Sequence, residues 1–350
     1  MNGKFWIALL LSTPIGFFGF HHALHNLGSW YNELNGDVIS ARTFYTSLPV
    51  LDAILTGQVT ATQLIHRHPF GNVLASLMYG MTGTFFAIIA TEGSRRHLQG
   101  TPLAWTWLWA ILANFMGLSN ILLILWIPLY FYHYPRSNDV HLWTVSTGRA
   151  RAILASLVIG YIPLVVYQSW IAEPNSTMEE NVILMWTLFP FAWVFLYVSS
   201  TPLFEPRNTS TAIAKNIIEI VQSKVAVETM YMFLGVLNLL MYFGLYLDTQ
   251  WNGILIKDSV VSLVMAQSHG GVGLSPLQLG QVLLSQFRLL DVVLATIGCS
   301  IWVLLQDGLF CAVVIALGSI LVGPGSSVAF YAAYRENRIQ DVNKLAKKGQ

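Results

Sequence analysis

The strongest constraint on this chain is a stretch near its C-terminal end that is almost free of charge. Two apolar runs occur there, Val292–Gln306 and Leu309–Ala333, and the short sequence Asp307-Gly308 separates them. Each run approaches the length that a helix needs to cross a bilayer, roughly 20 residues. We therefore expect two membrane-spanning helices that meet at a tight hairpin.

The whole chain has the composition of an integral membrane protein. Its 350 residues are 55% hydrophobic and only 10% charged, whereas soluble domains carry about 25% charged residues. The formal net charge is +1, which gives no electrostatic basis for binding nucleic acid. We predict an all-α, polytopic bundle of transmembrane helices, and we expect residues 1–350 to form a single domain in the lipid bilayer.

Eight segments are apolar enough to be membrane spans. They cover approximately residues 5–20, 70–91, 103–132, 152–171, 182–199, 225–247, 292–306 and 309–333. No internal repeat relates these segments, and a weakly amphipathic helix is expected at 276–287, before the seventh.

A further segment near residues 44–65 lies between the first two spans, in a polar and irregular region at 26–69. It contains the short amphipathic sequence Leu48-Pro49-Val50-Leu51-Asp52-Ala53-Ile54-Leu55, which ends near Gly57. Because this piece is too short to cross the bilayer, we expect it to lie in the interface or to re-enter the membrane. Asp52 is then either a solvated side chain or one acid of a functional site.

The C-terminal residues indicate a location. Lys347 and Lys348 stand fourth and third from the end, a pattern that resembles a retrieval signal of the endoplasmic reticulum, which is read in the cytosol. Arg335, Arg338 and Lys344 also favour a cytosolic tail over residues 335–350. An even number of spans places the N-terminus on the same side. We therefore expect a multi-pass protein of the endoplasmic reticulum membrane with both termini in the cytosol.

Polar side chains inside the spans need partners within the bundle. Asn114 and Asn120 lie in the middle of the third span, so both should face the bundle. Tyr231, Asn238 and Tyr242 form a stripe along one face of the sixth span.

Glu228 lies one turn inside the sixth span, four residues after Lys224. The spacing allows an i, i+4 ion pair at the membrane interface. Glu228 could alternatively serve as one of the acids of a site within the bundle.

The motifs of several enzyme classes are missing. The chain has no paired-aspartate motif for magnesium and diphosphate, no phosphate-binding glycine loop, no His-Glu-x-x-His and no Gly-x-Ser-x-Gly sequence. What remains is a set of isolated acids in an aromatic-rich bundle. The acids are Asp52, Glu92, Glu219, Glu228 and Asp291.

Isolated acids in an apolar bundle suit acid chemistry without a metal or cofactor. A buried carboxyl can remain protonated and serve as a Brønsted acid, and aromatic faces can stabilise a carbocation. These features fit a proton-initiated cyclisation of a polyene. They also fit a transporter with a proton relay.

Asp291 and Trp302 are eleven residues apart, which leaves them only about 20° out of alignment on a helix of 3.6 residues per turn. An acid and a large aromatic ring therefore share one helical face, with Ala295 and Gly298 between them. Arg288, three residues before Asp291, offers the alternative of an ion pair, in which the carboxylate could not donate a proton.

Three stretches resemble fungal integral-membrane terpene cyclases of meroterpenoid biosynthesis, of the ascochlorin and macrophorin type. The first is Leu48–Asp52, which is similar to an early proline-x-x-aspartate element of that family. The second is Asp291 with Trp302, and the third is Gly323-Pro324-Gly325 with the following span to Arg335-Glu336. The resemblance implies cyclisation of a farnesyl or epoxyfarnesyl chain on an aromatic or polyketide-derived head group, started by protonation of an olefin or epoxide.

We therefore expect Asp291 to be the leading candidate acid, with Glu228 and Asp52 as its partners or alternates. The side chains expected to contact the farnesylated substrate are Trp302, Tyr231, Asn238, Tyr242, Asn120 and Trp107. The alternative function is a small-molecule or lipid transporter of the endoplasmic reticulum membrane. A cyclase needs a closed, aromatic pocket, whereas a transporter needs a path that reaches both faces of the membrane.

Overall fold

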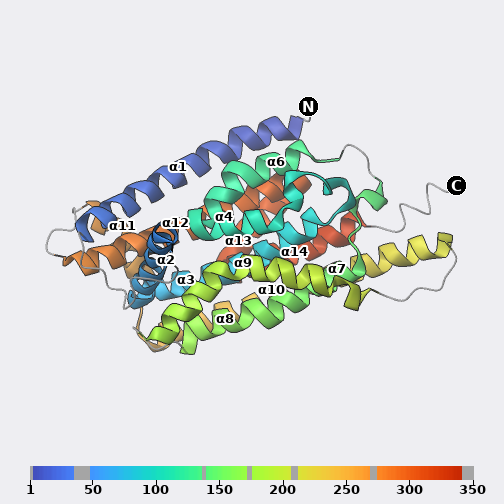
Figure 1. Cartoon of the computed structure of the whole chain (residues 1–350). Coiled ribbons are helices and arrows are strands. Elements are labelled where there is room, and N and C mark those ends of the chain that lie inside the picture. Colours follow the sequence, from blue (N-terminus) through green and yellow to red (C-terminus); the bar gives the residue numbers. More distant parts are fainter. Residues whose placement is uncertain are drawn as a thin grey trace.

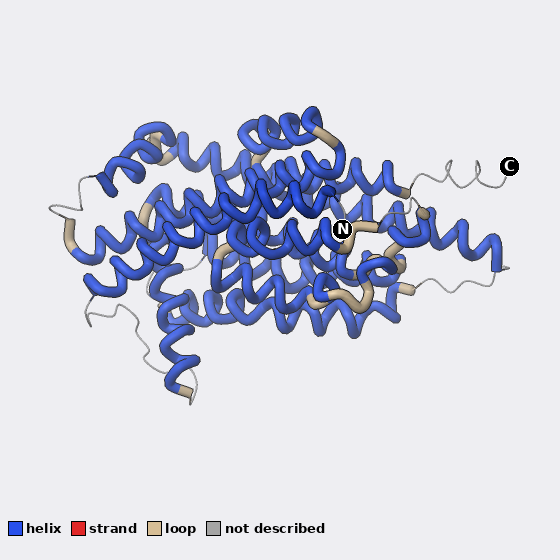
Figure 2. Tube along the Cα trace, turned by 90° about the horizontal axis from the view of Figure 1, so that it is seen from above, coloured by secondary structure: helices blue, strands red, loops and turns tan. Residues whose placement is uncertain are grey.

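The computed structural model describes residues 3–34, 48–135, 139–171, 176–205, 212–268 and 274–340. All regular structure in these ranges is helical, and the helices form an elongated bundle (Figures 1 and 2). The predicted all-α fold is therefore confirmed for this part of the chain. Lys344, Lys347 and Lys348, on which the predicted location depends, lie outside the described residues.

The helices carry the labels of Figure 1. In chain order they are α1 (Gly3–Leu34), α2 (Pro49–Arg67), α3 (Pro69–Gly93), α4 (Thr106–Met116), α5 (Leu118–Asn120), α6 (Ile127–Tyr132), α7 (Thr147–Ser156), α8 (Ile162–Val166), α9 (Thr177–Phe204), α10 (Ala212–Trp251), α11 (Ile256–Ser268), α12 (Pro276–Asp307), α13 (Leu309–Leu321) and α14 (Pro324–Ile339). Short 3-10 or π turns connect or extend them: η1 (Arg96–Leu98), η2 (Pro102–Ala104), η3 (Ile121–Trp126), η4 (Val140–Trp143), η5 (Leu157–Tyr161) and η6 (Tyr167–Ile171).

Six helical segments of the described chain are long and apolar enough to cross a membrane. They are Gly3–His25, Pro69–Gly93, Val140–Ser169, Thr177–Phe204, Ile218–Trp251 and Leu277–Asp307. These segments overlap six of the eight predicted spans, and they identify the chain as a multi-pass membrane protein.

The two remaining predicted spans are interrupted by glycine. Gly117 separates α4 from α5 with φ of 90°, and Gly323 separates α13 from α14 with φ of 87°. Only glycine adopts such angles readily, so the prediction of two unbroken helices over 103–132 and 309–333 is wrong. Gly308, with φ of 91°, ends α12 and begins α13, which confirms the predicted hairpin at Asp307-Gly308.

The region between the first two spans is more regular than predicted. α1 continues to Leu34, and α2 has 19 residues instead of the short piece that was expected to end near Gly57. α2 continues because its buried positions, Leu55, Val59 and Gln63, keep a helical spacing through Gly57. α2 runs steeply across the direction of the long helices (Figure 1).

The amphipathic segment predicted at 276–287 is the first part of α12. Ser275 caps this helix: its hydroxyl accepts from the backbone N–H of Gln278, whose side chain in turn accepts from the backbone N–H of Ser275. Such a capping box starts a helix efficiently. Because nothing breaks the helix before Asp307, α12 extends through 32 residues.

α3 is the central helix of the bundle. Within its most apolar stretch of 18 residues, 94% of the residues are buried. α2, α4, α10, α12 and α14 all contact it. α3 therefore packs against protein on nearly every side, and any charge at its end must find its partner inside the protein.

Four charged side chains meet at the C-terminal end of α3, and we call them the charge cluster: Glu92, Arg95, Arg335 and Glu336. Arg95 Nη2 lies 2.8 Å from Glu92 Oε1 and 2.6 Å from Glu336 Oε2, and Arg335 Nη1 lies 2.8 Å from Glu92 Oε1. All four side chains are at most 2% exposed. Burial acts to lower the pKa of Arg95, but Glu336 and Glu92 outweigh it, and the pKa is raised above its ordinary value.

Aromatic rings enclose the charge cluster. The guanidinium of Arg335 lies 5.5 Å from the ring centre of Trp143 and 5.3 Å from that of Trp302. The hydroxyl of Tyr130 donates to Glu92 Oε2 at 3.1 Å and accepts from Arg335 Nη2 at 2.6 Å. Arg335 and Glu336 therefore belong to the core, and the prediction that a cytosolic tail begins at residue 335 is wrong on this point.

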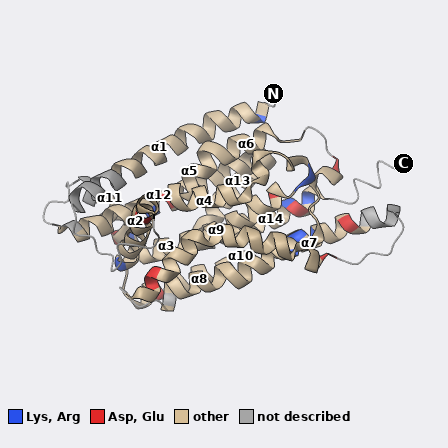
Figure 3. Cartoon of the chain, in the orientation of Figure 1, with Lys and Arg blue, Asp and Glu red and all other residues tan. Residues whose placement is uncertain are grey.

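The charged residues of the described chain lie mainly toward the two ends of the bundle (Figure 3). One end holds the charge cluster. The other end holds α2 and the start of α9, with the buried carboxyls Asp52, Glu179 and Glu180. We call them the cluster end and the α2 end.

We predict that Glu92→Gln destabilises the protein strongly. The substitution leaves two buried guanidiniums with a single carboxylate, and removal of one partner from a buried ion pair typically costs about 3–5 kcal/mol. The free energy of unfolding, measured with denaturant on the protein purified in detergent, should fall by about that amount.

Glu219→Gln is the matched control. Glu219 forms an ion pair with Arg96 at 2.9 Å, but the two side chains are 34% and 49% exposed. Loss of an exposed pair should cost less than about 1 kcal/mol. Equal destabilisation by the two substitutions would contradict the special role of the buried cluster.

Candidate functional site

Asp291 is buried in the middle of α12, with 1% of the residue exposed. Its Oδ1 accepts two hydrogen bonds from Ser119, one from the backbone N–H at 2.9 Å and one from the hydroxyl at 2.6 Å. Ser119 is the second residue of α5, where backbone N–H groups have no partner within the helix. Gly117 occupies the capping position there but has no side chain, so Asp291 supplies the cap from another helix.

The second oxygen of Asp291 is less constrained. Its Oδ2 lies 3.8 Å from Arg288 Nη1, which is an ion-pair contact but is longer than a hydrogen bond. Oδ2 is buried and has no hydrogen-bond partner, and the same is true of Arg288 Nε. Because Oδ1 already accepts both Ser119 donors, a proton on this carboxyl would reside on Oδ2.

A cavity of about 310 Å³ has two neighbours of this carboxyl, Gly117 and Arg288, in its wall, and we call it the Asp291 cavity. Its apolar wall comes from α1, α2, α4 and α12. The residues that line it are Phe20, Ala23, Leu24, Gln58, Ala61, Thr62, Ile65, Asn114, Phe115, Met116, Gly117, Leu284, Phe287 and Arg288. A methyl group added at Gly117 would lie 3.3 Å from Asp291 Oδ1 and 3.3 Å from the Phe287 ring, so Asp291 stands one layer of atoms behind the wall.

Polar atoms without hydrogen-bond partners lie in the wall of the Asp291 cavity and next to it. Asn114 lines it, and its Oδ1 is buried without a hydrogen-bond partner. Asn120 Nδ2 donates to the Met116 carbonyl at 2.6 Å, but its Oδ1 is also unpaired. Both amides face the bundle as predicted. Buried polar atoms normally find a partner, so the cluster indicates a place for water or for a polar group of a ligand.

A second polar group at the α2 end was missed by the sequence analysis. His66 Nδ1 lies 2.6 Å from Asn72 Oδ1, and His66 Nε2 lies 3.0 Å from the Tyr79 hydroxyl. Burial lowers the pKa of His66 to about 4, so the ring is neutral near pH 7. The contacts fit an Nδ1–H that donates to Asn72 and an Nε2 that accepts from Tyr79. Single polar residues on α2 and α3 gave no motif that could reveal this chain of contacts.

Asp52 is buried on the inner face of α2, with 4% of the residue exposed. The alternative of a solvated Asp52 is therefore wrong. On the same helix, Gln63 donates to Glu179 Oε2 at 3.1 Å. Asp52 thus belongs to the α2 end of the bundle, as Asp291 does.

Trp302 does share a face of α12 with Asp291, but the two side chains do not meet. Eleven residues correspond to about 16 Å along a helix. The Trp302 ring contacts Trp126, Tyr331 and Arg335, so it encloses the charge cluster. The predicted pairing of acid and aromatic ring is therefore wrong, because helical alignment fixes direction and not distance.

Glu228 also lies far from Asp291. Asn238 of α10 contacts Thr84 of α3, and Tyr231 of the same helix interacts with Thr91, so α10 and α3 are antiparallel. Glu228 precedes Tyr231 by one turn and therefore lies beyond Thr91, at the cluster end. Its expected partner Lys224 donates instead to Asn337 Oδ1 at 2.7 Å.

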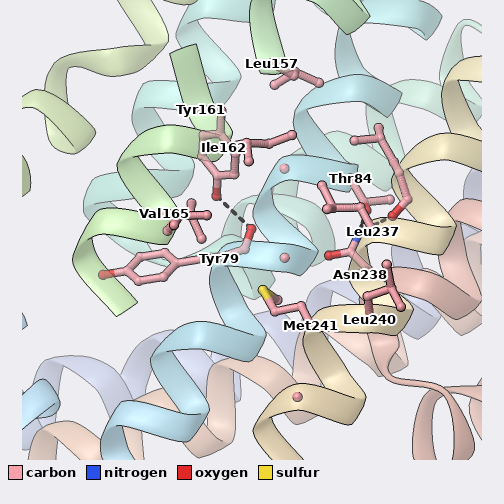
Figure 4. Close-up of a pocket in the computed structure, with 15 residues that line it drawn as sticks. Tyr79, Thr84, Leu157, Tyr161, Ile162, Val165, Leu237, Asn238, Leu240 and Met241 are labelled. Atoms are coloured by element: carbon pink, nitrogen blue, oxygen red, sulfur yellow. Dashed lines mark hydrogen bonds between the residues drawn. The ribbon is translucent and has the colours of Figure 1, made fainter. Parts of the chain in front are cut away.

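Asn238 lines a separate lateral cavity of about 230 Å³ between α3, α8 and α10 (Figure 4). Its Nδ2 donates to Thr84 Oγ1 and to the Leu234 carbonyl, both at 2.9 Å. Tyr242, one turn further, donates to the Ile320 carbonyl at 2.6 Å. None of the described residues that line this cavity carries a carboxyl group, so the cavity lacks an acid for catalysis.

Trp107 lies on the outside of the bundle and is 43% exposed. Its ring stacks on Phe191 with 6.3 Å between ring centres. The predicted site residues therefore fall into several places, and among them Asp291 and Asn120 lie close together, both next to Gly117.

No metal site is apparent in the described part of the chain, where no group of three His, Cys, Asp or Glu side chains is placed to hold an ion. Comparisons with protein-family models, with curated proteins and with solved structures found no match to this chain.

We predict that Gly117→Ala disturbs the site and the fold together. The backbone angle at Gly117 is nearly exclusive to glycine, and a strained residue of this kind costs about 1–3 kcal/mol. The added methyl would also press on Asp291 and Phe287. Stability in detergent should fall by about that amount, and the order of the α4–α5 region, followed by hydrogen exchange, should decrease.

Two other glycines serve as controls that separate backbone strain from contact of the added methyl with Asp291. Gly308 has the same positive φ but open space around it, and Gly244 is helical with open space around it. Gly308→Ala should show the strain alone, while Gly244→Ala should be neutral or slightly stabilising. Similar hydrogen exchange near Ser119 in the Gly117 and Gly308 variants would contradict the proposed contact with Asp291.

Proposed function

We propose that this protein is a membrane-embedded terpene cyclase that acts on a farnesyl or epoxyfarnesyl chain of a meroterpenoid precursor. One observation carries the proposal: a buried carboxyl, one oxygen of which has no hydrogen-bond partner, stands behind the wall of a largely apolar cavity lined by three phenylalanines. The resemblance of Leu48–Asp52, Asp291 and Gly323–Gly325 to fungal membrane cyclases supports the same class. No metal or cofactor is assigned a part in the reaction.

In the proposed mechanism, Asp291 donates a proton from Oδ2 to the terminal olefin or epoxide of the chain. Ser119 holds Oδ1 and thereby fixes the direction of Oδ2. Arg288 lies at ion-pair distance from Oδ2 and favours the ionised carboxylate, so the proposed mechanism requires Asp291 to take up a proton before the chain is protonated. A donor fixed in direction is the arrangement that general-acid catalysis uses.

The cavity wall would control the cationic intermediate. The faces of Phe20, Phe115 and Phe287 can stabilise positive charge on the folding chain, and the aliphatic residues exclude water that would quench it. Loss of a proton from the ring cation completes an isomerisation. The Asp291 carboxylate, regenerated by the first step, is a suitable acceptor for that proton.

Asn114 offers a position for the polar head group. Its unpaired Oδ1 lines the Asp291 cavity together with Gln58 and Thr62. A phenol or related hydroxyl could donate to this oxygen while the farnesyl chain occupies the apolar part. The amide would then set the distance between head group and acid, and so the point at which the chain is protonated.

The break at Gly117 also favours a second candidate function. Transporters commonly form substrate sites where a transmembrane helix is interrupted near the middle of the bilayer. A transporter of small molecules or lipids would use Asp291 and Arg288 as a binding pair instead of an acid.

We predict that Asp291→Asn abolishes most of the turnover while the protein still folds. Asparagine keeps the shape of the side chain but removes the titratable proton, and loss of a general acid typically costs about 10²–10⁴ in rate. Microsomes that contain each variant are incubated with a farnesylated phenol or with its terminal epoxide, and the products are separated by chromatography. Asp291→Glu should retain part of the activity.

Asp248→Asn is the control, because Asp248 is an exposed carboxylate at the end of α10. Asp307 is unsuitable despite its place at the hairpin, because its carboxylate accepts from the Tyr331 hydroxyl at 2.8 Å and pairs with Arg338. Wild-type turnover by Asp291→Asn would move the assignment to Asp52, the other predicted acid at the α2 end. Uptake of the substrate into sealed vesicles without any product would favour the transporter.

We further propose six crossings of the endoplasmic reticulum membrane, one for each long helical segment. The pair α4–α6 is a hairpin, because Thr106 and Tyr130 both lie at the cluster end, and α13–α14 is another, because Asp307 before α13 binds Tyr331 of α14. The predicted count of eight spans is therefore reduced to six, which is still an even number. Both termini then lie in the cytosol. A tag at the C-terminus should be digested by protease added to intact microsomes. Protection of the tag until detergent is added would overturn this topology.

A further inference from the structure

An amphipathic site on the outside of the bundle is distinct from the Asp291 cavity. A cavity of about 410 Å³ lies between the start of α4, the start of α7 and the end of α9. Its lining is rich in donors: Ser94, Gln99, Thr106, Ser146, Arg149 and Thr201. We call it the Arg149 cavity.

An apolar groove of about 340 Å³ continues from the Arg149 cavity. The two share Trp107, Val194 and Val198 as lining residues, so they form adjoining parts of one depression. Phe191 and Phe195 line the outer part of the groove and are 53% and 72% exposed. In a bilayer these rings face acyl chains, while a tryptophan such as Trp107 prefers the boundary with the head groups.

Arg149 is the charged residue of this site, and its charge is not neutralised by the protein. The guanidinium lies 5.2 Å from the ring centre of Tyr197, and its Nη1 is buried without a hydrogen-bond partner. Among the described residues no carboxylate lies within ion-pair distance of Arg149. Glu205, the carboxylate on this side of α7, packs against Gly148 instead.

A buried, unpaired N–H of a guanidinium is costly unless a ligand or water accepts its proton. Arginine is also the residue that best matches phosphate, because its planar N–H groups can bind two oxygens at once. The neighbouring hydroxyls of Ser94 and Ser146 are further donors for phosphate oxygens, whereas the Thr201 hydroxyl already donates to the Tyr197 carbonyl. The polar part of the site therefore fits a phosphate group.

We propose that this depression binds a phospholipid of the surrounding membrane. The phosphate of the head group is held by Arg149, and one acyl chain lies along Trp107, Phe191 and Phe195. The continuous apolar groove favours a lipid over a free anion, since a soluble phosphate would gain nothing from it.

The proposed lipid site is independent of the proposed catalytic site. Thr106 begins α4 beside the Arg149 cavity, whereas Asn114 and Gly117 lie beside the Asp291 cavity at the other end of that helix. The separation is about 12–16 Å along α4. Trp107, expected from the sequence to contact the substrate, belongs in this proposal to the lipid site.

The test measures lipid binding to the protein purified in detergent, by native mass spectrometry. Phosphatidylglycerol is compared with diacylglycerol of the same chains, which lacks the phosphate. Arg149→Gln should weaken phosphatidylglycerol binding about tenfold or more, the usual effect of losing a hydrogen bond to a charged group. Arg151→Gln is the matched control, because Arg151 is exposed and two residues away on the same helix.

Further variants keep the test decisive if Arg149→Gln folds poorly. Trp107→Ala alters only an exposed ring and should also weaken binding, and Arg149→Lys should restore part of it. Equal binding by the Arg149→Gln and Arg151→Gln variants would overturn the proposal, as would equal binding of diacylglycerol and phosphatidylglycerol. Displacement of the lipid by millimolar inorganic phosphate, with no effect of Trp107→Ala, would show a site for a soluble anion and would overturn it too.

Discussion

The buried pairing of Glu92 with Arg95 and Arg335 is the interaction on which the rest of the structure depends. α3 is enclosed by other helices, so the carboxylate at its end cannot reach bulk water. An uncompensated charge there would cost several kcal/mol. Arg95 lies just after α3, but Arg335 lies 243 residues after Glu92 in the chain. Its pairing with Glu92 requires α14 to pack inside the bundle. The position of α14 in turn explains the break at Gly323, where the chain turns back into the protein after α13.

The polar groups of the bundle are divided between two ends that have different physical characters. Within the charge cluster, each charge has an opposite charge at hydrogen-bond distance, and Tyr130 and the tryptophans enclose the group. Such a saturated cluster holds helices together and leaves little capacity for a ligand. At the α2 end, Asp291 Oδ2 and the Asn114 oxygen are buried without a hydrogen-bond partner near a cavity. A ligand-binding site needs a cavity with a few polar atoms that are free to bind the ligand. We therefore propose that the reaction takes place at the α2 end and that the charge cluster stabilises the fold.

The sequence was sufficient for the fold class and for most of the spans, because apolar runs of bilayer length depend only on local composition. The hairpin at Gly308 was also predictable, since a charged residue and a glycine interrupt an apolar run there.

The partners of the polar residues were not predictable. Ser119 and Asp291 are 172 residues apart, and nothing in either local sequence indicates the other. Trp302 was grouped with Asp291 because the two share a face of one helix, and Glu228 because it is also an acid in an apolar span. The directions of α12 and α10 place both residues at the cluster end. Arg335 and Glu336 resembled a soluble tail because a short sequence window does not show which helix will cover it.

The break at Gly117 connects the fold to the candidate site. A helix that restarts inside a membrane exposes backbone N–H groups that neither lipid nor its own residues can satisfy. A polar acceptor from a neighbouring helix must therefore approach it, and Asp291 does so with one oxygen only. The capping requirement thus explains why a carboxyl is buried at this point, and the geometry of the cap explains why its second oxygen is left over. Gly117 itself opens the space, since a side chain there would fill the gap between Asp291 and Phe287. The same glycine creates the need for the acid and leaves room beside it for a ligand.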